Sequence, residues 1–330
     1  MQQKTKSMIK WGIVGAGNIA HSFSKDLALV NGGILTSVAS RDVTKARSFA
    51  EEYGAPNSYG SYQELFNSKT VDVIYIATPH TSHAELSIAA MKAGNNVLCE
   101  KPLGVNNKQV QEMIKVAKEN NVFLMEALWT RFNPTIKKVK ALVDQGTIGQ
   151  VGYLHADFAF YGLDRDEKGR LLNPELAGGS LLDIGIYPIF LSYLLLGIPK
   201  EIQAAANFYK TGIEVQTSMI FNYENAQAVL YSGLHSNSEK KAEIAGSKGS
   251  IYLHPRWHET SGYTIEKEGE VEVNEVGKLG KGYTYEIDEV QKCLNLGKKE
   301  SELWSHQNSL DLIELMDTVR HKTGIVFPFE

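Results

Sequence analysis

The residues with the clearest chemical potential are a lysine after one apolar run and an acid–phenol pair in another. Lys101 follows a short apolar stretch at residues 97–99 and lies between Glu100 and Pro102. Buried lysines and glutamates are rare unless they are paired or functional. The proline keeps Lys101 in the extended region and permits a cis bond, so its ammonium is directed rather than mobile. An ion pair with Glu100 and a solvated surface position are the alternatives to a catalytic role.

The acid–phenol pair is Asp183 and Tyr187, four residues apart in an apolar segment that follows Gly178 and Gly179. On a helix this spacing places both side chains on one face. The glycines allow a close approach of the backbone, and Pro188 would kink the helix or break its first turns. A lysine ammonium would stabilise a developing alkoxide and lower the pKa of a neighbouring phenol. A core tyrosine that reaches solvent beside a helix-capping aspartate is the alternative.

A glycine turn follows the first apolar strand, expected at residues 8–14. Gly15, Gly17 and Ala20 form the pattern G-x-G-x-x-A where a helix from about residue 18 to 30 begins. This is the dinucleotide fingerprint: a tight turn, a close approach to the pyrophosphate, and a small residue for helix–strand packing. The helix N-terminus favours the diphosphate charge. A purely structural turn is the alternative.

The end of the second strand indicates which nicotinamide cofactor is preferred. Ser40 stands where NAD-preferring sites usually have an acid, and Arg41 follows it. Arginine is a planar and permanently charged phosphate ligand, which predicts NADP over NAD. Asp42 could instead bind the ribose, which would leave NAD possible, or it could cap the next helix.

Polar residues also follow the apolar strand expected at residues 71–77. Thr78, Pro79, His80 and His83 lie at the carboxyl edge of the sheet, where open α/β folds bind ligands. Capping of the next helix by a neighbouring hydroxyl is compatible with cofactor contact. A direct catalytic role for either histidine is the less favoured interpretation.

The order of elements predicts two domains. Strands alternate with helices over residues 1–126, which is typical of a doubly wound parallel α/β (Rossmann) domain. Residues 127–330 are predicted to form an α+β domain with an open antiparallel sheet, because many strands follow without intervening helices. The expected strands of this second part cover residues 151–161, 201–208, 214–223, 226–234, 241–245 and 250–254. Helices at about 285–296 and 305–321 close the chain.

The composition, 43% apolar and 22% charged residues among 330, is that of a soluble globular protein. The net charge of -4 argues against nucleic acid as a partner. Two cysteines and no apolar leader before the first strand favour a reducing, cytoplasmic location. Residues 180–199 are long and apolar enough for a membrane span, but a charge such as Asp183 costs about 2.5–3.5 kcal/mol in lipid. We therefore expect a buried core helix, no membrane contact and no metal site.

Four motifs occur in one order: the glycine turn, the segment ATPxxxH, the triplet Glu100-Lys101-Pro102 and the segment GGxxLDxGxY. Together they resemble the Gfo/Idh/MocA oxidoreductases over essentially the whole chain. Residues 125–132 and 182–187 look most like the branch of dihydrodiol dehydrogenases and NADP-dependent D-xylose dehydrogenases. The resemblance implies a homodimer or homotetramer formed through the exposed face of the C-terminal sheet.

The resemblance also implies roles for particular residues. Lys101 is catalytic, and Tyr187 is the proton donor or acceptor where many members have histidine, with Asp183 as its orienting or substrate-binding partner. The residues assigned to the substrate are Phe158, Asp183, Tyr187 and, as a weaker match, Trp257. The residues assigned to the cofactor are Gly15, Ala16, Gly17, Asn18, Ile19, Ser40, Arg41, Thr78, Pro79, His80, His83, Glu100, Lys101, Trp129 and Arg131.

The sequence thus predicts an NADP(H)-dependent oxidoreductase that transfers a hydride between the nicotinamide and an alcohol or carbonyl of a sugar, cyclitol or diol. In the oxidation direction Tyr187 would take the hydroxyl proton with the help of Lys101. The alternatives are a hydrolase or lyase that uses a tightly bound NAD(P) as a transient hydride acceptor, and a non-catalytic NADP-binding regulator.

Overall fold

The computed structural model describes residues 8–330, which divide into two compact units. The first unit holds the described residues up to Gly104, together with Lys108–Phe132 and Leu279–Leu310. The second holds Val105–Asn107, Asn133–Lys278 and Asp311–Glu330. These units differ from the expected single boundary after residue 126, because the chain returns to the first unit beyond residue 278.

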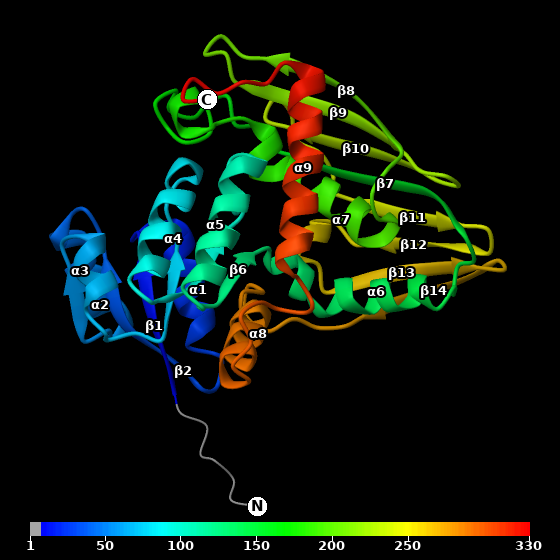
Figure 1. Cartoon of the computed structure of the whole chain (residues 1–330). Coiled ribbons are helices and arrows are strands. Elements are labelled where there is room, and N and C mark those ends of the chain that lie inside the picture. Colours follow the sequence, from blue (N-terminus) through cyan, green and yellow to red (C-terminus); the bar gives the residue numbers. More distant parts are fainter. Residues whose placement is uncertain (1–7) are drawn as a thin grey trace, which may run out of the picture. The chain divides into compact units, whose positions relative to one another are not determined.

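The first unit is built on a parallel six-stranded sheet in the order β3-β2-β1-β4-β5-β6 (Figure 1). Its strands are β1 (Ile9–Val14), β2 (Gly33–Ala39), β3 (Asn57–Tyr59), β4 (Val73–Ile76), β5 (Asn96–Glu100) and β6 (Leu124–Ala127). Its helices are α1 (Asn18–Leu27), α2 (Val43–Tyr53), α3 (Tyr62–Asn67), α4 (His83–Lys92), α5 (Asn107–Glu119, whose first residue belongs to the second unit) and α8 (Thr284–Asn295). The central strands are buried on both faces and read as continuous apolar runs, as parallel strands between helix layers do.

One carboxylate helps to hold the segment by which the chain returns to this unit. Asp26 of α1 accepts hydrogen bonds from the backbone N–H groups of Lys281, Gly282 and Tyr283, at 2.9, 2.9 and 2.8 Å. These contacts hold the segment that leads into α8. Their partners are more than 250 residues apart, so no local pattern could have indicated them.

The second unit contains a mixed eight-stranded sheet in the order β14-β13-β12-β11-β7-β10-β9-β8 (Figure 1). Its strands are β7 (Val151–Ala159), β8 (Glu201–Phe208), β9 (Glu214–Asn222), β10 (Gln227–Gly233), β11 (Ala242–Gly246), β12 (Gly249–Leu253), β13 (Gly262–Lys267) and β14 (Glu270–Glu275). All neighbours are antiparallel except β7 and β10, which pair in parallel. The expectation of an antiparallel sheet is corrected at this one pair.

Only one face of this sheet is packed. Along β7, Leu154 and Ala156 are fully buried, and α7 (Ile186–Leu196) contacts both β7 and β10. The helix α6 (Pro134–Asp144) lies against β13. The final helix, α9 (His306–Thr323), has its residues up to Leu310 in the first unit and the rest in the second.

The apolar segment of residues 174–196 is interrupted rather than continuous. It is long and apolar enough to span a membrane, with a mean hydropathy of 1.6, but 78% of its most apolar window is buried within the protein, as in a core helix. A 3-10 turn, Pro174–Leu176, and a π-helical turn, Leu181–Gly185, precede α7. Pro188 lies in the first turn of α7, directly after the π-helical turn, and itself has no backbone N–H to donate.

The π-helical turn is held in place by the buried carboxyl group of Glu214 on β9. Its oxygens accept hydrogen bonds from the Ser180 hydroxyl, from the Thr217 hydroxyl at 2.8 Å and from the backbone N–H of Leu181 at 3.0 Å. Burial raises the pKa of Glu214 from 4.5 to about 7, although these hydrogen bonds act to lower it. This carboxyl group therefore fixes the start of the turn that carries Asp183.

We predict that Glu214 makes the stability of the protein depend on pH. Because its pKa is higher in the folded state, its contribution to stability is complete below pH 4.5 and is lost as the pH rises to about 7. Between these values the free energy of unfolding should fall by about 1.4 kcal/mol per pH unit relative to Glu214→Gln, and the difference should level off above pH 7. Urea unfolding of both proteins from pH 5 to 8 measures this difference. Parallel pH dependences would contradict it.

Candidate active site

The glycine turn between β1 and α1 has the geometry that a dinucleotide requires. Gly15 has φ +97°, and a Cβ there would lie 2.8 Å from the Ala77 carbonyl oxygen, so only glycine fits. Gly17 precedes the first turn of α1 with no side-chain cap, and a Cβ on it would meet nothing within 4 Å. The N-terminal N–H groups of α1 are therefore available to an anion. Ala16, Asn18 and Ile19 complete this predicted cofactor turn.

At the end of β2, Asp42 acts as a helix cap. Its Oδ1 accepts hydrogen bonds from the backbone N–H groups of Thr44 at 2.9 Å and Lys45 at 3.3 Å. Ser40 is buried, and its hydroxyl accepts the N–H of Asp42 at 3.2 Å. Arg41 is exposed. Asp42 therefore caps the helix α2, and Arg41 exposes its guanidinium at the end of β2.

The turn after β4 contributes a hydroxyl and a buried histidine. Thr78 Oγ1 is buried and has no hydrogen-bond partner within residues 8–330. His83 is fully buried, with its nitrogens 2.8 Å from the Pro102 carbonyl oxygen and 2.9 Å from that of Thr78. Burial lowers the pKa of His83, while the hydrogen bonds to the two carbonyl oxygens act to raise it. His83 therefore links the turns after β4 and β5, while His80 lies in the intervening 3-10 turn His80–Ser82.

Lys101 follows β5 directly and is only 9% exposed, which excludes the alternative of a solvated surface lysine. The Lys101–Pro102 bond is cis. Glu126 lies nearby and is buried. Burial raises its pKa, while hydrogen bonds to it and the charge of Lys101 lower it. Glu126 accepts the backbone N–H of Leu103 at 3.0 Å, and so anchors the chain just beyond Lys101.

Sequence reasoning did not find the residues that support Glu126. The Trp304 indole donates to Glu126 Oε2 at 3.0 Å, and the Ser309 hydroxyl donates to the same oxygen at 2.7 Å. Both donors come from residues 279–310, which were expected in the other domain. An acid at the end of β6 was the only local signal that such partners were needed.

Two predicted cofactor residues follow β6. The Trp129 ring stacks on Tyr283, with centroids 4.9 Å apart and an angle of 14° between the planes. Arg131 donates from Nε to the Leu303 carbonyl oxygen at 2.8 Å. Trp129 thus belongs to an aromatic pair, and Arg131 helps to hold the returning segment.

In the second unit, Asp183 and Tyr187 are both buried, at 8% and 5% exposure. Asp183 Oδ1 accepts a hydrogen bond from Arg170 Nη1 at 2.8 Å. The Tyr187 ring lies 5.5 Å from Phe158 and 5.2 Å from His258, and the last two rings stack at 4.2 Å. We call Phe158, Tyr187 and His258 the aromatic cluster.

Trp257, the weaker substrate prediction, lies in the 3-10 turn Trp257–Glu259. It is fully buried, and its Nε1 donates to the Asp157 carbonyl oxygen at 2.9 Å. The next residue, His258, was not predicted from the sequence, and its ring contacts Tyr187.

The glycines before Asp183 are required by the chain's own packing. A Cβ on Gly178 would lie 2.7 Å from the Leu171 carbonyl oxygen. Gly179 has φ +116°, and a Cβ there would lie 2.7 Å from Glu214 Oε2. The predicted close approach is therefore made by backbone and by Glu214, which accounts for both glycines.

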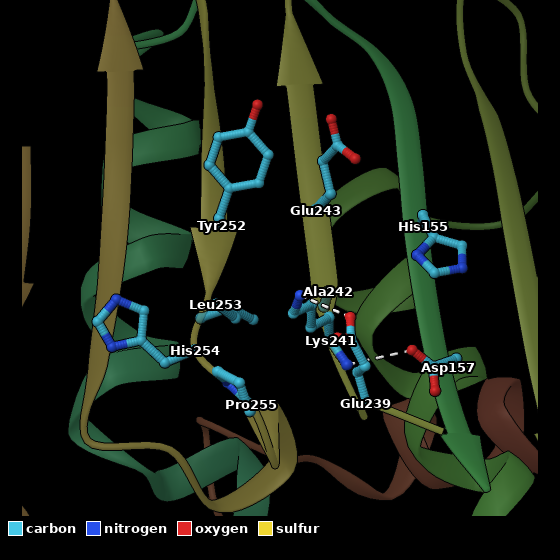
Figure 2. Close-up of a pocket in the computed structure, with 10 residues that line it drawn as sticks. All are labelled: His155, Asp157, Glu239, Lys241, Ala242, Glu243, Tyr252, Leu253, His254 and Pro255. Atoms are coloured by element: carbon cyan, nitrogen blue, oxygen red, sulfur yellow. Dashed lines mark hydrogen bonds and ion pairs between the residues drawn. The ribbon is translucent and has the colours of Figure 1, made fainter. Parts of the chain in front are cut away.

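A separate hollow of about 370 Å³ lies on the outer face of the sheet, over β7, β11 and β12 (Figure 2). Figure 2 shows His155, Glu243 and Tyr252 side by side on that face, with Asp157 near Lys241. Side chains alternate along a strand, so His155 and Asp157 of β7 point to the face opposite to that of Phe158. This hollow is therefore not part of the aromatic cluster, and residues 8–330 contain no group of His, Cys, Asp and Glu arranged to hold a metal ion.

Comparison with known proteins identifies both parts of the chain. Residues 9–128 match the family model described as an oxidoreductase family with an NAD-binding Rossmann fold, and residues 136–252 match the Gfo/Idh/MocA C-terminal domain. The trans-1,2-dihydrobenzene-1,2-diol dehydrogenase of Xenopus tropicalis is 36% identical over 97% of this chain and 99% of its own. The human protein of that name is 32% identical over 97% of this chain and 98% of its own.

Solved structures agree with this relationship. The 3-ketoreductase KijD10 from Actinomadura kijaniata, in complex with NADP and TDP-benzene, has a TM-score of 0.86 and 26% identity over 96% of this chain and 98% of its own. An aldose-aldose oxidoreductase from Caulobacter crescentus, complexed with glycerol, shares the fold with a TM-score of 0.88, 23% identity and coverage of 96% and 97%. Family models match both parts of the chain, and its relatives align with it over nearly their whole length. This protein is therefore an NAD(P)-binding dehydrogenase or reductase of the Gfo/Idh/MocA oxidoreductase family.

Proposed function

We propose that this protein uses NADP(H) to interconvert a secondary alcohol and the corresponding ketone on a sugar, cyclitol or diol. The observation that carries the proposal is the buried lysine Lys101, placed directly after a central strand of a dinucleotide-binding sheet. Relatives named as diol dehydrogenases, and an NADP-bound ketoreductase with the same fold, support the substrate class.

The residues of the first unit fit a dinucleotide. The cradle at Gly15, the open N-terminus of α1 and the partnerless hydroxyl of Thr78 lie in the turns that follow β1 and β4. Arg41 would hold the 2′-phosphate that distinguishes NADP from NAD, because Asp42 is engaged as a helix cap. When bound, the nicotinamide supplies the hydride acceptor or donor, and the protein supplies orientation and charge.

We assign the proton of the alcohol to Tyr187 and the stabilisation of charge to Lys101. In the oxidation direction Tyr187 acts as its phenolate: the oxygen takes the hydroxyl proton and becomes a neutral phenol, and the Lys101 ammonium stabilises the negative charge that develops. Asp183, held by Arg170, orients the substrate through its carboxylate. The rings of the aromatic cluster would cover the apolar face of a sugar or diol.

The outer face of the second unit's sheet supports a further part of the proposal, namely a dimer or tetramer. Tyr153, Ile220 and Val229 are exposed large apolar side chains on β7, β9 and β10. Ile220 and Val229 are cross-strand partners, so they form a continuous apolar surface. Both cysteines, Cys99 and Cys293, are buried and unpaired, which is compatible with the cytoplasmic location that we propose.

A panel of sugars, cyclitols, diols and their carbonyl forms, assayed with NADP(H) and NAD(H), tests the reaction and its cofactor together. We expect turnover of at least one class, a lower KM for NADP(H), and an increase in that KM on the order of tenfold for Arg41→Ala, because one charge-assisted phosphate contact is lost. The KM for NAD(H) should not change. Arg47→Ala, an exposed arginine of α2, is the matched control. Equal losses with both cofactors would contradict the phosphate assignment.

The assembly is tested by sedimentation of the wild type and of Ile220→Lys/Val229→Lys. We expect a dimer or tetramer for the wild type and a monomer for the double variant, because two buried cations would be placed in an apolar interface. Leu29→Lys, at an exposed apolar position of the first unit, should leave the assembly intact. A monomeric wild type at micromolar concentration would refute the proposal.

A further inference from the structure

The segment of residues 299–309 lies along β6, the edge strand of the six-stranded sheet. The Lys299 carbonyl oxygen accepts the backbone N–H of Leu124 at 3.1 Å, and His306 Nε2 lies 3.0 Å from the Leu124 carbonyl oxygen. An edge strand presents unpaired backbone groups, so one role of this segment is to cover the edge. The same segment also contacts the side chain of Glu126 on β6, and covering the edge does not explain that contact.

Glu126 is buried, and each of its carboxyl oxygens meets at least one donor. Its Oε1 accepts the backbone N–H of Leu103 at 3.0 Å. Its Oε2 accepts the indole N–H of Trp304 at 3.0 Å and the hydroxyl of Ser309 at 2.7 Å. A carboxylate accepts hydrogen bonds and donates none, so three donors suit its ionised form.

The hydrogen bond between Glu126 and Leu103 fixes the turn that carries Lys101. Leu103 is two residues beyond the lysine, and the carbonyl oxygen of the intervening Pro102 lies 2.8 Å from His83 Nδ1. The two residues that follow the lysine are therefore attached to buried side chains of other elements, α4 and β6. A displacement of the Glu126 carboxylate would move the Leu103 backbone and change the direction of the Lys101 side chain.

Trp304 and Ser309 determine the position of that carboxylate. Both are buried, and both donate to Oε2, which leaves Oε1 for the backbone of Leu103. Trp304 precedes α9, and Ser309 lies in its first turn, so one short segment supplies both donors. Apolar side chains would fill these two places equally well, so packing alone does not account for an indole N–H and a hydroxyl directed at one oxygen.

We propose that Trp304 and Ser309 are positioning residues for the proposed reaction: they hold the Glu126 carboxylate, which fixes the turn of residues 101–103 and thereby the direction of the Lys101 ammonium. This inference rests on the proposed catalytic role of Lys101. The segment that returns to the first unit beyond residue 278 thus contributes to turnover through Glu126, in addition to covering the edge of the sheet.

The test measures kcat and the KM for NADP(H), with the best substrate, in Trp304→Phe, Ser309→Ala, their combination, Glu126→Gln and the triple variant. We expect the combination to lower kcat on the order of tenfold with the KM for cofactor nearly unchanged, because a small displacement of a reacting group lowers turnover. Glu126→Gln should lose at least as much, because its amide N–H group must face one of the three donors. The triple variant should be within about twofold of Glu126→Gln, because the two donors act only through the carboxylate.

Trp11→Phe and Ser37→Ala are the matched controls and should keep the wild-type kcat. Trp11 is a fully buried tryptophan of β1 whose Nε1 has no hydrogen-bond partner among residues 8–330. Ser37 is a fully buried serine of β2 whose hydroxyl lies 2.8 Å from that of Thr70. Thermal unfolding establishes that each variant is folded, and the two single variants provide the comparison if the combined variant is not.

A role limited to covering the sheet edge gives a different result. The melting temperature would fall while every folded variant kept the wild-type kcat, and this would overturn the inference. Losses that multiply when Trp304→Phe and Ser309→Ala are added to Glu126→Gln would also overturn it. Lys101→Met separates the two levels: normal turnover in that variant would reject the proposed function and the positioning role together, whereas a large loss there with unaffected Trp304 and Ser309 variants would reject the positioning role alone.

Discussion

A buried ammonium group is the feature on which the first unit depends. Lys101 is 9% exposed, and a lysine charge is unfavourable in such a place unless acidic groups surround it. Two strands supply acids: the charge of Lys101 acts on Glu126 at the end of β6, and Glu100 of β5 accepts the backbone N–H of Lys101. Each of these acids is in turn held by donors, Tyr75 for Glu100, and Trp304 and Ser309 for Glu126. The positive charge thus explains why acids that would otherwise destabilise a core are found at this sheet edge.

In the second unit, a few polar contacts hold the Asp183 carboxylate and the Tyr187 phenol at the start of an apolar helix. A π-helical turn carries Asp183, and Glu214 fixes its first residues through a hydroxyl and a backbone N–H. Arg170 binds the Asp183 carboxylate, and the stacked rings of Phe158 and His258 limit the orientation of Tyr187. The helix α7 is apolar on nearly all sides, so these few polar contacts determine the positions of the Asp183 and Tyr187 side chains.

The sequence predicted those parts of the structure whose conformation depends on residues that are close together in the chain. The glycine turn could be recognised because Gly15 has φ +97° and leaves no room for a Cβ. Gly178 and Gly179 also leave no room for a Cβ. The family match confirms the doubly wound domain and the oxidoreductase class. Strands β13 and β14 were missed because neither has a strong apolar alternation, and β14 is a charged and largely exposed edge strand.

Contacts between distant segments could not be predicted. The return of residues 279–310 depends on Asp26 and Glu126 binding groups far along the chain, and neither acid differs locally from an ordinary helix or strand residue. The contact between the rings of His258 and Tyr187 has the same cause, because packing sets the direction of each side chain in a 3-10 turn. Glu286 of α8 is likewise fully buried, although acids are mostly found at protein surfaces.

The central claim of the proposed function is that Lys101 and Tyr187 both act in the proton-transfer step. A double-mutant cycle in kcat/KM, with Lys101→Met, Tyr187→Phe and the combined variant, measures this directly, and cofactor binding is followed separately by fluorescence. Each single variant should lose on the order of 10²–10⁴-fold and still bind NADP(H), and the combined variant should be no slower than the slower single variant. Losses that multiply in the combined variant, or near-normal turnover in Tyr187→Phe, would show that the two residues do not share one step.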